Sequence, residues 1–412
     1  MVMVYMIERK PVVLLYILVF IAFSNISVFT VEKLGIPAMP VIYSLALAII
    51  LLDLLTSEPY PLKNYQNPNS YIIILFFLLY ITIGFINTNI SEAVFAVYDL
   101  LVGFAIYNLI LLYVNRKEEL EGMMLVMMLS APFIMLQGAF GLITDLSRMG
   151  TDTTLRVGGW WGDPNYYAIV ICFSYLASIY FMRKDSKLLR WLAYFVQLSA
   201  AAGVFLSLSR SGIIFLIAIT LMHWRSFWRR KSFIIAMVAL GLLISMVFSI
   251  YTSDITGLEK FELQRLSIFQ GQNESDITNG RLDAAVGGLL IYLEHPAVGA
   301  GFGNILQTAD RLNSLKLHTH NMFLEILAVS GPLPFFGYVF MLVYLYFSMR
   351  KTKKGPGSLG DVFSTIPIIL AIMGLFAHYL LSIKPVWIIL ACIPVYSQLK
   401  AGELHAYSDD SG

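Results

Sequence analysis

Charged side chains are scarce in this chain of 412 residues: they make up 13% of the sequence, against roughly 25% in soluble domains. Hydrophobic residues make up 58%, and the mean hydropathy is +0.74. This balance excludes an ordinary soluble domain and indicates a protein that crosses a membrane many times. The formal net charge of +2 says little, because the charges are segregated into loops. We expect no nucleic-acid partner.

Cysteines and metal-ligand patterns are also nearly absent. The two cysteines, Cys172 and Cys392, lie in apolar runs, where a buried thiol packs as a small hydrophobic group, so we predict no disulfide. His318 and His320 form a His-x-His pair, but no cysteine or further histidine follows at the spacing of a zinc site. The glycine run at 299–303 lacks the flanking strand and helix of a dinucleotide-binding fingerprint. We therefore expect no metal and no cofactor.

Long apolar runs are abundant. The first follows Glu8-Arg9-Lys10 and is long enough, at about 20 residues, to be a transmembrane helix and not a cleaved signal peptide. Backbone groups in lipid must be satisfied within their own segment, which predicts helices. The spans are expected near residues 12–30, 38–56, 71–86, 93–114, 121–143, 164–182, 188–207, 211–224, 232–251, 321–348, 363–382 and 386–400. We predict an all-α integral membrane protein, a single polytopic domain over 1–412 with about twelve transmembrane helices.

Lysine and arginine gather in loops of one parity. The clusters include Arg9-Lys10, Arg116-Lys117, Arg183-Lys184, Arg229-Arg230-Lys231 and Arg350-Lys351. The positive-inside rule then places both termini in the cytoplasm and the long polar loop 252–320 outside. Within that loop, apolar residues at helical spacing over 281–293 predict a short amphipathic helix along the membrane surface.

Several candidate functional residues follow this loop, where a new apolar helix begins. His318 and His320 are each able to act as a general base at neutral pH, and the alternative is an interfacial histidine with a satisfied hydrogen bond. Asn321 and Glu325 are four residues apart, which puts them on one helical face. Glu325 falls about one turn inside the apolar region, where an ionisable residue is a functional candidate by default.

Three arginines are the candidate anion-binding residues of the outer side. Arg210 lies between two predicted spans, against the positive-inside rule, and its planar charge suits a phosphate. The alternative for Arg210 is snorkelling to lipid headgroups. Arg156 precedes a Gly-Gly-Trp-Trp-Gly run, and Arg281 opens the amphipathic helix. Asp163 before Pro164 is typical of a helix N-cap, which gives Asp163 a structural role.

Taken in order, these motifs resemble the O-antigen ligase and polymerase superfamily of bacterial envelope enzymes. The resemblance covers about residues 155–335 and rests on four features. They are Arg156 with Asp163-Pro164-Asn165, then Ser209-Arg210-Ser211-Gly212, then Gly280-Arg281 with His295 to Asn304, and finally His320-Asn321-Met-Phe-Leu-Glu325 with Gly331. The flanking helices match in hydropathy alone.

The resemblance implies a membrane glycosyltransferase that needs neither metal nor nucleotide sugar. The donor would be a glycan on undecaprenyl pyrophosphate, and the acceptor a glycan or lipid A core hydroxyl at the outer face of the bacterial cytoplasmic (inner) membrane. Arg210, Arg281 and Arg156 would hold the pyrophosphate, His320 would activate the acceptor, and His318, Asn321 and Glu325 would support it. Ligase is favoured because His320 and the single long loop fit the ligase pattern. The alternatives are an O-antigen or exopolysaccharide polymerase and a transporter of lipid-linked sugar.

Overall fold

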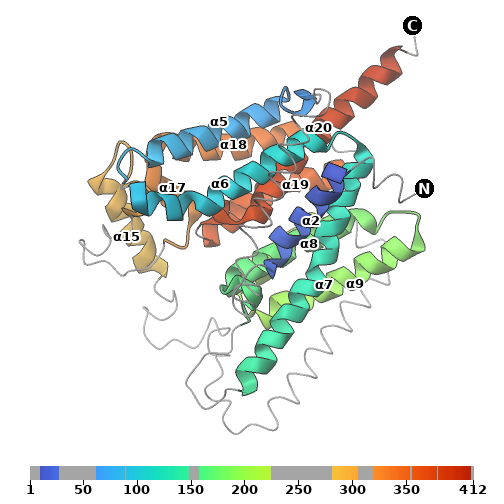
Figure 1. Ribbon diagram of the computed structural model, residues 1–412, viewed down its shortest axis with the longest axis horizontal. Helices are drawn as coiled ribbons and strands as arrows, with labels where there is room; N and C mark the ends of the chain where they lie inside the picture. The colour runs from blue at the N-terminus through green and yellow to red at the C-terminus, as the bar shows by residue number, and fades with distance from the viewer. Residues whose placement is uncertain are drawn as a thin grey trace.

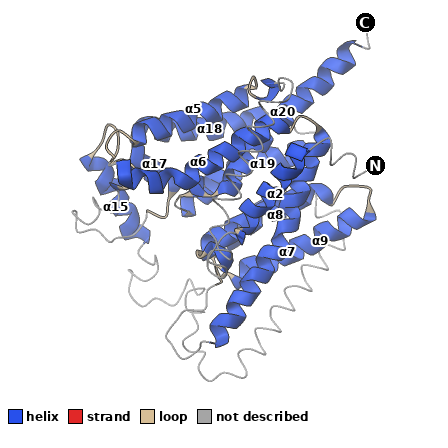
Figure 2. Cartoon of the chain, in the orientation of Figure 1, coloured by secondary structure: helices blue, strands red, loops and turns tan. Residues whose placement is uncertain are grey.

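The computed structural model describes residues 10–26, 62–88, 90–147, 157–223, 281–304, 319–352, 355–377 and 379–409. Over these residues the chain forms helices and the turns between them, with no strand, so the all-α prediction is confirmed there (Figures 1 and 2). The helices are α2 (Lys10–Ser24), α5 (Pro68–Gly84), α6 (Ile90–Tyr113), α7 (Lys117–Ser147), α8 (Pro164–Phe181), α9 (Lys187–Leu206), α10 (Arg210–Met222), α15 (Arg281–Glu294), α17 (Met322–Ser330), α18 (Pro332–Arg350), α19 (Leu359–Phe376) and α20 (Lys384–Asp409). Three short 3-10 turns, η1 (Leu62–Asn64), η2 (Gly159–Trp161) and η4 (Leu380–Ser382), complete the described elements.

Five of these helices are long and apolar enough to cross a membrane: α7, α9, α18, α19 and α20. The helices α2, α5, α6 and α10 contain shorter apolar stretches. The predicted spans 38–56 and 232–251 lie outside the described residues, so the total of about twelve stays a prediction.

The helices begin where the sequence supplies a capping side chain. Side-chain oxygens at the N-caps accept backbone N–H groups that the first turn leaves without partners. The capping residues are Asn67 for α5, Asp163 for α8, Ser186 for α9, Ser209 for α10, Asn321 for α17 and Ser358 for α19. Proline follows the cap of α5 and α8, and Pro332 opens α18, where the fixed φ of proline suits a helix start. The predicted cap at Asp163 is therefore confirmed.

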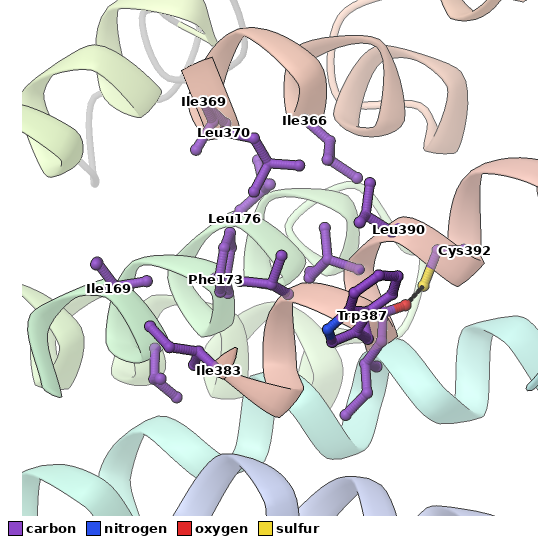
Figure 3. Close-up of a cluster of buried hydrophobic side chains, with 14 of the residues drawn as sticks. Ile169, Phe173, Leu176, Ile366, Ile369, Leu370, Ile383, Trp387, Leu390 and Cys392 are labelled. Carbon is purple, nitrogen blue, oxygen red and sulfur yellow. Dashed lines mark hydrogen bonds between the residues drawn. The ribbon is translucent and has the colours of Figure 1, made fainter. Parts of the chain in front are cut away.

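Helix α8 is the centre of the bundle. It packs against α7, α9, α10, α19 and α20, and nearly every side chain from Tyr167 to Ile179 is buried. Figure 3 shows Phe173 and Leu176 of α8 in one buried cluster with Ile366 and Leu370 of α19. A helix that is apolar on all sides belongs in the interior. Helix α8 is therefore the central helix against which the surrounding helices pack.

Around α8, helices pack against other helices that are distant from them in the sequence. Helix α6 packs along α20, and α5 packs along α18 (Figure 1). Trp387 of α20 is fully buried among aromatic rings of α5 and α6, and Gly103 leaves the space that its ring fills. Its indole N–H donates to the carbonyl of Leu381 at 2.6 Å, so the ring is both packed and hydrogen-bonded.

The predicted helix over 321–348 is broken in the structure into α17 and α18. The break is at Gly331, which has φ +76°, a conformation that glycine adopts without strain, and Pro332 then starts the next helix. A Cβ on Gly331 would also lie 2.7 Å from the carbonyl oxygen of Ala297. The apolar pattern is continuous across this point, so hydropathy alone hid the break.

The glycine run 299–303 closes the gap at this break. The N–H of Ala300 donates to the carbonyl of Ala328 at 2.7 Å, and the N–H of Gly301 to that of Val329 at 2.9 Å. On its other side the run meets the end of α5, where the N–H of Phe302 donates to Gly84 at 3.0 Å. The run therefore supplies partners for carbonyls that the interrupted helix would leave unpaired in an apolar setting.

Candidate functional site

The start of α10 holds Arg210 in a well-defined backbone. Ser209 caps the helix, since its Oγ accepts the N–H of Gly212 at 3.1 Å, and the preceding Leu208 has φ +48°. Ser209 and Ser211 are buried, whereas Arg210 between them is partly exposed. The local sequence thus turns the flanking hydroxyls inward, whereas Arg210 keeps part of its surface exposed.

The start of α8 lies beside that of α10. Asn165, in the first turn of α8, accepts at its Oδ1 the hydroxyl of Ser209 at 2.8 Å and that of Ser211 at 3.1 Å. Asp163 caps α8 by accepting the N–H of Asn165 at 2.6 Å. The N-terminal ends of two helices are therefore joined by side chains, and the partial positive charges of both ends lie close together.

A third helix start carries the histidine. Asn321 caps α17, because its side-chain oxygen accepts the N–H groups of Phe323 at 2.9 Å and Leu324 at 3.1 Å. Asn321 is thus the N-cap of α17, and its backbone carbonyl accepts the N–H of Glu325 at 3.0 Å, four residues further along the chain. His320 immediately precedes the cap, is partly exposed, and has φ +49°, a left-handed conformation uncommon outside glycine.

Glu325 is a buried carboxyl group in the first turn of α17. It is 2% exposed, and its Oε2 accepts the backbone N–H of Tyr379 at 2.7 Å. Its other oxygen, Oε1, has no hydrogen-bond partner in the described part of the chain, and it borders a small cavity with Tyr80 and Ser382. Burial, and next the nearby Glu325 carboxyl, raise the pKa of the Tyr379 phenol, which lies beyond the end of α19.

The N-terminal ends of α8, α10 and α17 all lie near the last turn of α19. Asn321 reaches the carbonyl of Leu375 through its Nδ2 at 3.5 Å, and the ring of Phe376 lies 6.2 Å from that of Phe215 in α10. Helix α8 also packs against α19. The starts of α8, α10 and α17 are therefore neighbours around one end of α19, although 157 residues separate Asp163 from His320 by sequence number.

The amphipathic helix predicted over 281–293 is present as α15, Arg281–Glu294. It packs against α17, and Gly288 lies close to the residues at the start of that helix: a Cβ on Gly288 would lie 2.6 Å from Cγ2 of Thr319. Thr319 is buried and directly precedes His320. Arg281 opens a helix that is held against the residue next to the predicted base.

Two predicted site residues, Arg156 and His318, lie outside the described residues. Arg210, Arg281, His320, Asn321 and Glu325 lie inside them. Across the described ranges, no three histidine, cysteine or acidic side chains are grouped as a metal site would require.

Sequence reasoning missed two residues of this region, Asn165 and Tyr379. Asn165 was quoted only as part of a motif, and the sole signal for it was an amide directly after the proline that starts an apolar helix. No sequence signal indicated that the backbone of Tyr379, with φ +47°, would bind Glu325, because a backbone donor carries no residue signature.

The fold and the helix starts together define a helical membrane protein with a polar site at one end of its helices. Residues 194–342, from α9 into α18, match the model of a family described as O-antigen ligase, and this match supports membership of the chain in the O-antigen ligase family. The matched segment includes Arg210, Arg281, His320 and Glu325. A comparison with curated proteins found no match.

Proposed function

We propose that this protein transfers a glycan from an undecaprenyl-pyrophosphate carrier to an acceptor hydroxyl, as an O-antigen ligase does. The observation that carries the proposal is that Arg210, the first residue of α10, and His320, which precedes the cap of α17, both lie in the family match, and that both helices pack against α19. A cationic group and a base at one end of a helix bundle suit a reaction in which an anionic leaving group departs and a hydroxyl is activated.

In the proposed reaction the bond between the sugar anomeric carbon and the phosphate oxygen breaks, and a new bond forms from that carbon to the acceptor oxygen. The proton of the acceptor hydroxyl passes to His320, and undecaprenyl pyrophosphate leaves with the electron pair of the broken bond. Arg210, Arg281 and Arg156 neutralise the charge on the departing pyrophosphate. Asn321 caps α17 and Glu325 anchors it, so both hold His320 in place. His318 would support the same site. Lipid A core or another glycan supplies the acceptor, and no metal takes part.

We also propose that the site faces the outside of the cytoplasmic membrane of a bacterium, with both termini in the cytoplasm. The distribution of basic loops supports this orientation, since the clusters at Arg116-Lys117 and Arg183-Lys184 lie at the helix ends opposite the starts of α8 and α10. About twelve helices in one domain and an outer loop over 252–320 complete the proposed topology.

One observation bears on the alternative of a transporter for lipid-linked sugar. Transporters often use a broken helix whose free backbone groups coordinate the substrate or ion, and the α17–α18 pair is a broken helix. Here, however, the carbonyls of Ala328 and Val329 at the break already accept hydrogen bonds from Ala300 and Gly301. The break is therefore sealed by protein, which favours the enzyme.

The test is a transfer assay with the purified protein, a lipid-pyrophosphate-linked oligosaccharide, EDTA and no nucleotide. A single product on lipid A core supports a ligase, and a ladder on the carrier identifies a polymerase. If no product forms but the lipid-linked sugar crosses the bilayer of proteoliposomes, the enzyme proposal is wrong.

A His320→Ala variant separates the two classes further. A general base contributes about 10²- to 10⁴-fold to a rate, so turnover should fall by that factor while the donor still binds. A transporter should be little affected by the same change, and unchanged turnover in the variant would remove His320 from the chemistry.

A further inference from the structure

The carboxamide of Asn165 is engaged on one side and open on the other. The residue is 9% exposed, and its Oδ1 accepts the hydroxyls of Ser209 and Ser211 at 2.8 and 3.1 Å. Its Nδ2 makes no hydrogen bond to the residues that the structure describes, and it is not sealed from solvent. Since buried amide donors are nearly always satisfied, water or a ligand must take these hydrogens.

The hydrogen-bond network determines which way this amide points. The hydroxyls of Ser209 and Ser211 lie 3.0 Å apart, so only one of them can donate to the other, and the second hydroxyl hydrogen needs another acceptor. The carboxamide oxygen of Asn165, 2.8 Å from the Ser209 hydroxyl and 3.1 Å from that of Ser211, is that acceptor. The oxygen therefore faces the serines, and the Nδ2 donors are left on the opposite branch of the same rigid group.

The surroundings of these donors favour an anion. The first turns of α8 and α10 present backbone N–H groups with partial positive charge, and Arg210 lies between the two serines that hold Asn165. Asp163 is the opposing charge on α8, and its Oδ1 accepts the backbone N–H of Asn165. Around Asn165 the chain thus places one arginine and two helix N-termini together with one capping carboxylate.

We propose that the Nδ2 of Asn165 donates a hydrogen bond to a phosphate oxygen of the donor's pyrophosphate, next to Arg210. This assignment rests on the proposed function and adds to it a binding residue whose donor is aimed by Ser209 and Ser211. The amide is neutral, so it recognises the phosphate oxygen by direction, whereas Arg210 recognises it by charge.

The experiment measures binding of undecaprenyl pyrophosphate to the full-length protein in phosphatidylcholine nanodiscs, with inorganic pyrophosphate as a competitor. Asn165→Asp keeps an acceptor for both serines and replaces the donor by an anionic oxygen. Asn165→Ala removes both groups and serves as a second variant if the first fails to fold. The control is Ser174→Ala, which changes another buried polar side chain of α8 that bonds only to its own helix.

Asn165→Asp and Asn165→Ala should each weaken binding by about 10- to 100-fold, the effect of losing one hydrogen bond to a charged group, and Ser174→Ala should bind normally. In the transfer assay the KM for the donor should rise and the KM for the acceptor should not. Inorganic pyrophosphate should compete with the lipid in the parent protein and less well in Asn165→Asp.

Each other result overturns the assignment. If Asn165→Ala weakens binding but Asn165→Asp does not, the residue acts by holding the serines and not as a donor. If both bind normally while Arg210→Ala does not, the proposed function stands and the role of Asn165 is wrong. If inorganic pyrophosphate never competes, the amide contacts another part of the lipid. If the parent protein binds no lipid pyrophosphate, the proposed function fails together with this inference.

Discussion

Helix α10 is tied to the bundle by buried polar side chains at both of its ends, and the two ends differ. At the N-terminal end, Ser209 and Ser211 bond to Asn165 of α8. At the C-terminal end, the two ring nitrogens of His223 lie 3.1 Å from an oxygen of Asp361 and 3.2 Å from the hydroxyl of Thr365, both in α19.

The difference lies in what remains after the protein has bonded to itself. His223 is 1% exposed and engages α19 through both nitrogens, and the same Asp361 oxygen also accepts the N–H of Gly357 at 2.6 Å. At the other end, the Nδ2 of Asn165 bonds to no described residue, and Arg210 is partly exposed. A buried polar cluster whose groups all have hydrogen-bond partners within the protein stabilises the fold. A cluster that keeps a hydrogen-bond donor accessible to solvent is suited to binding a ligand.

The largest effect that tests this contrast is expected for Arg210→Ala. Losing a positioned donor to a charged leaving group should lower the transfer rate by about 10²- to 10³-fold, and Tm should change little because Arg210 is partly exposed. Arg190→Ala, in the first turn of α9, is the matched control and should keep normal transfer. A large fall in Tm for Arg210→Ala would show that both ends of α10 are structural.

Asp361→Ala should give the opposite result. Removing the carboxylate leaves the buried ring of His223 and the N–H of Gly357 without their acceptor, which should destabilise the protein by about 1–3 kcal/mol. Transfer per folded molecule should be unchanged. Thermal unfolding in detergent and a rate normalised to folded protein measure the two quantities, and a rate that falls with unchanged Tm would contradict the structural role.

Gly288→Ala should affect both quantities moderately. The new methyl group would collide with Thr319, and overpacking of this kind costs about 1–3 kcal/mol. Because Thr319 directly precedes His320, we expect kcat to fall more than donor affinity. Gly402→Ala, where a Cβ meets nothing within 4 Å, is the matched control. Equal losses of kcat and affinity would mean that α15 does not position His320.

The smallest effect is expected for Glu325→Gln. The amide oxygen of glutamine can still accept the N–H of Tyr379, so Tm and transfer should stay close to those of the parent protein. Glu325→Leu removes the acceptor and should lower stability by about 1–3 kcal/mol. If Glu325→Gln instead abolishes transfer at normal Tm, the carboxyl group itself takes part in the reaction and is more than an anchor.

Local signals predicted the parts of the site that depend on local chemistry. The Asp-Pro pair correctly indicated the start of α8, and the spacing of apolar residues correctly predicted α15. The break at Gly331 was missed, because the run of apolar residues on both sides masks a single glycine whose φ depends on the segment at 299–303. Asn165 was missed as a site residue because its partners, Ser209 and Ser211, are 44 and 46 residues away.

The sequence by itself determined that this is a helical membrane protein, that α8 begins at Asp163-Pro164 and α15 at Arg281, and which charged residues are out of place in an apolar chain. These follow from composition, capping and periodicity, which act within one or two helical turns. Only the tertiary structure decided that the starts of α8, α10 and α17 meet at the end of α19, and that Glu325 binds the backbone of Tyr379. Such contacts depend on how whole helices pack, and packing depends on side chains far apart in the chain.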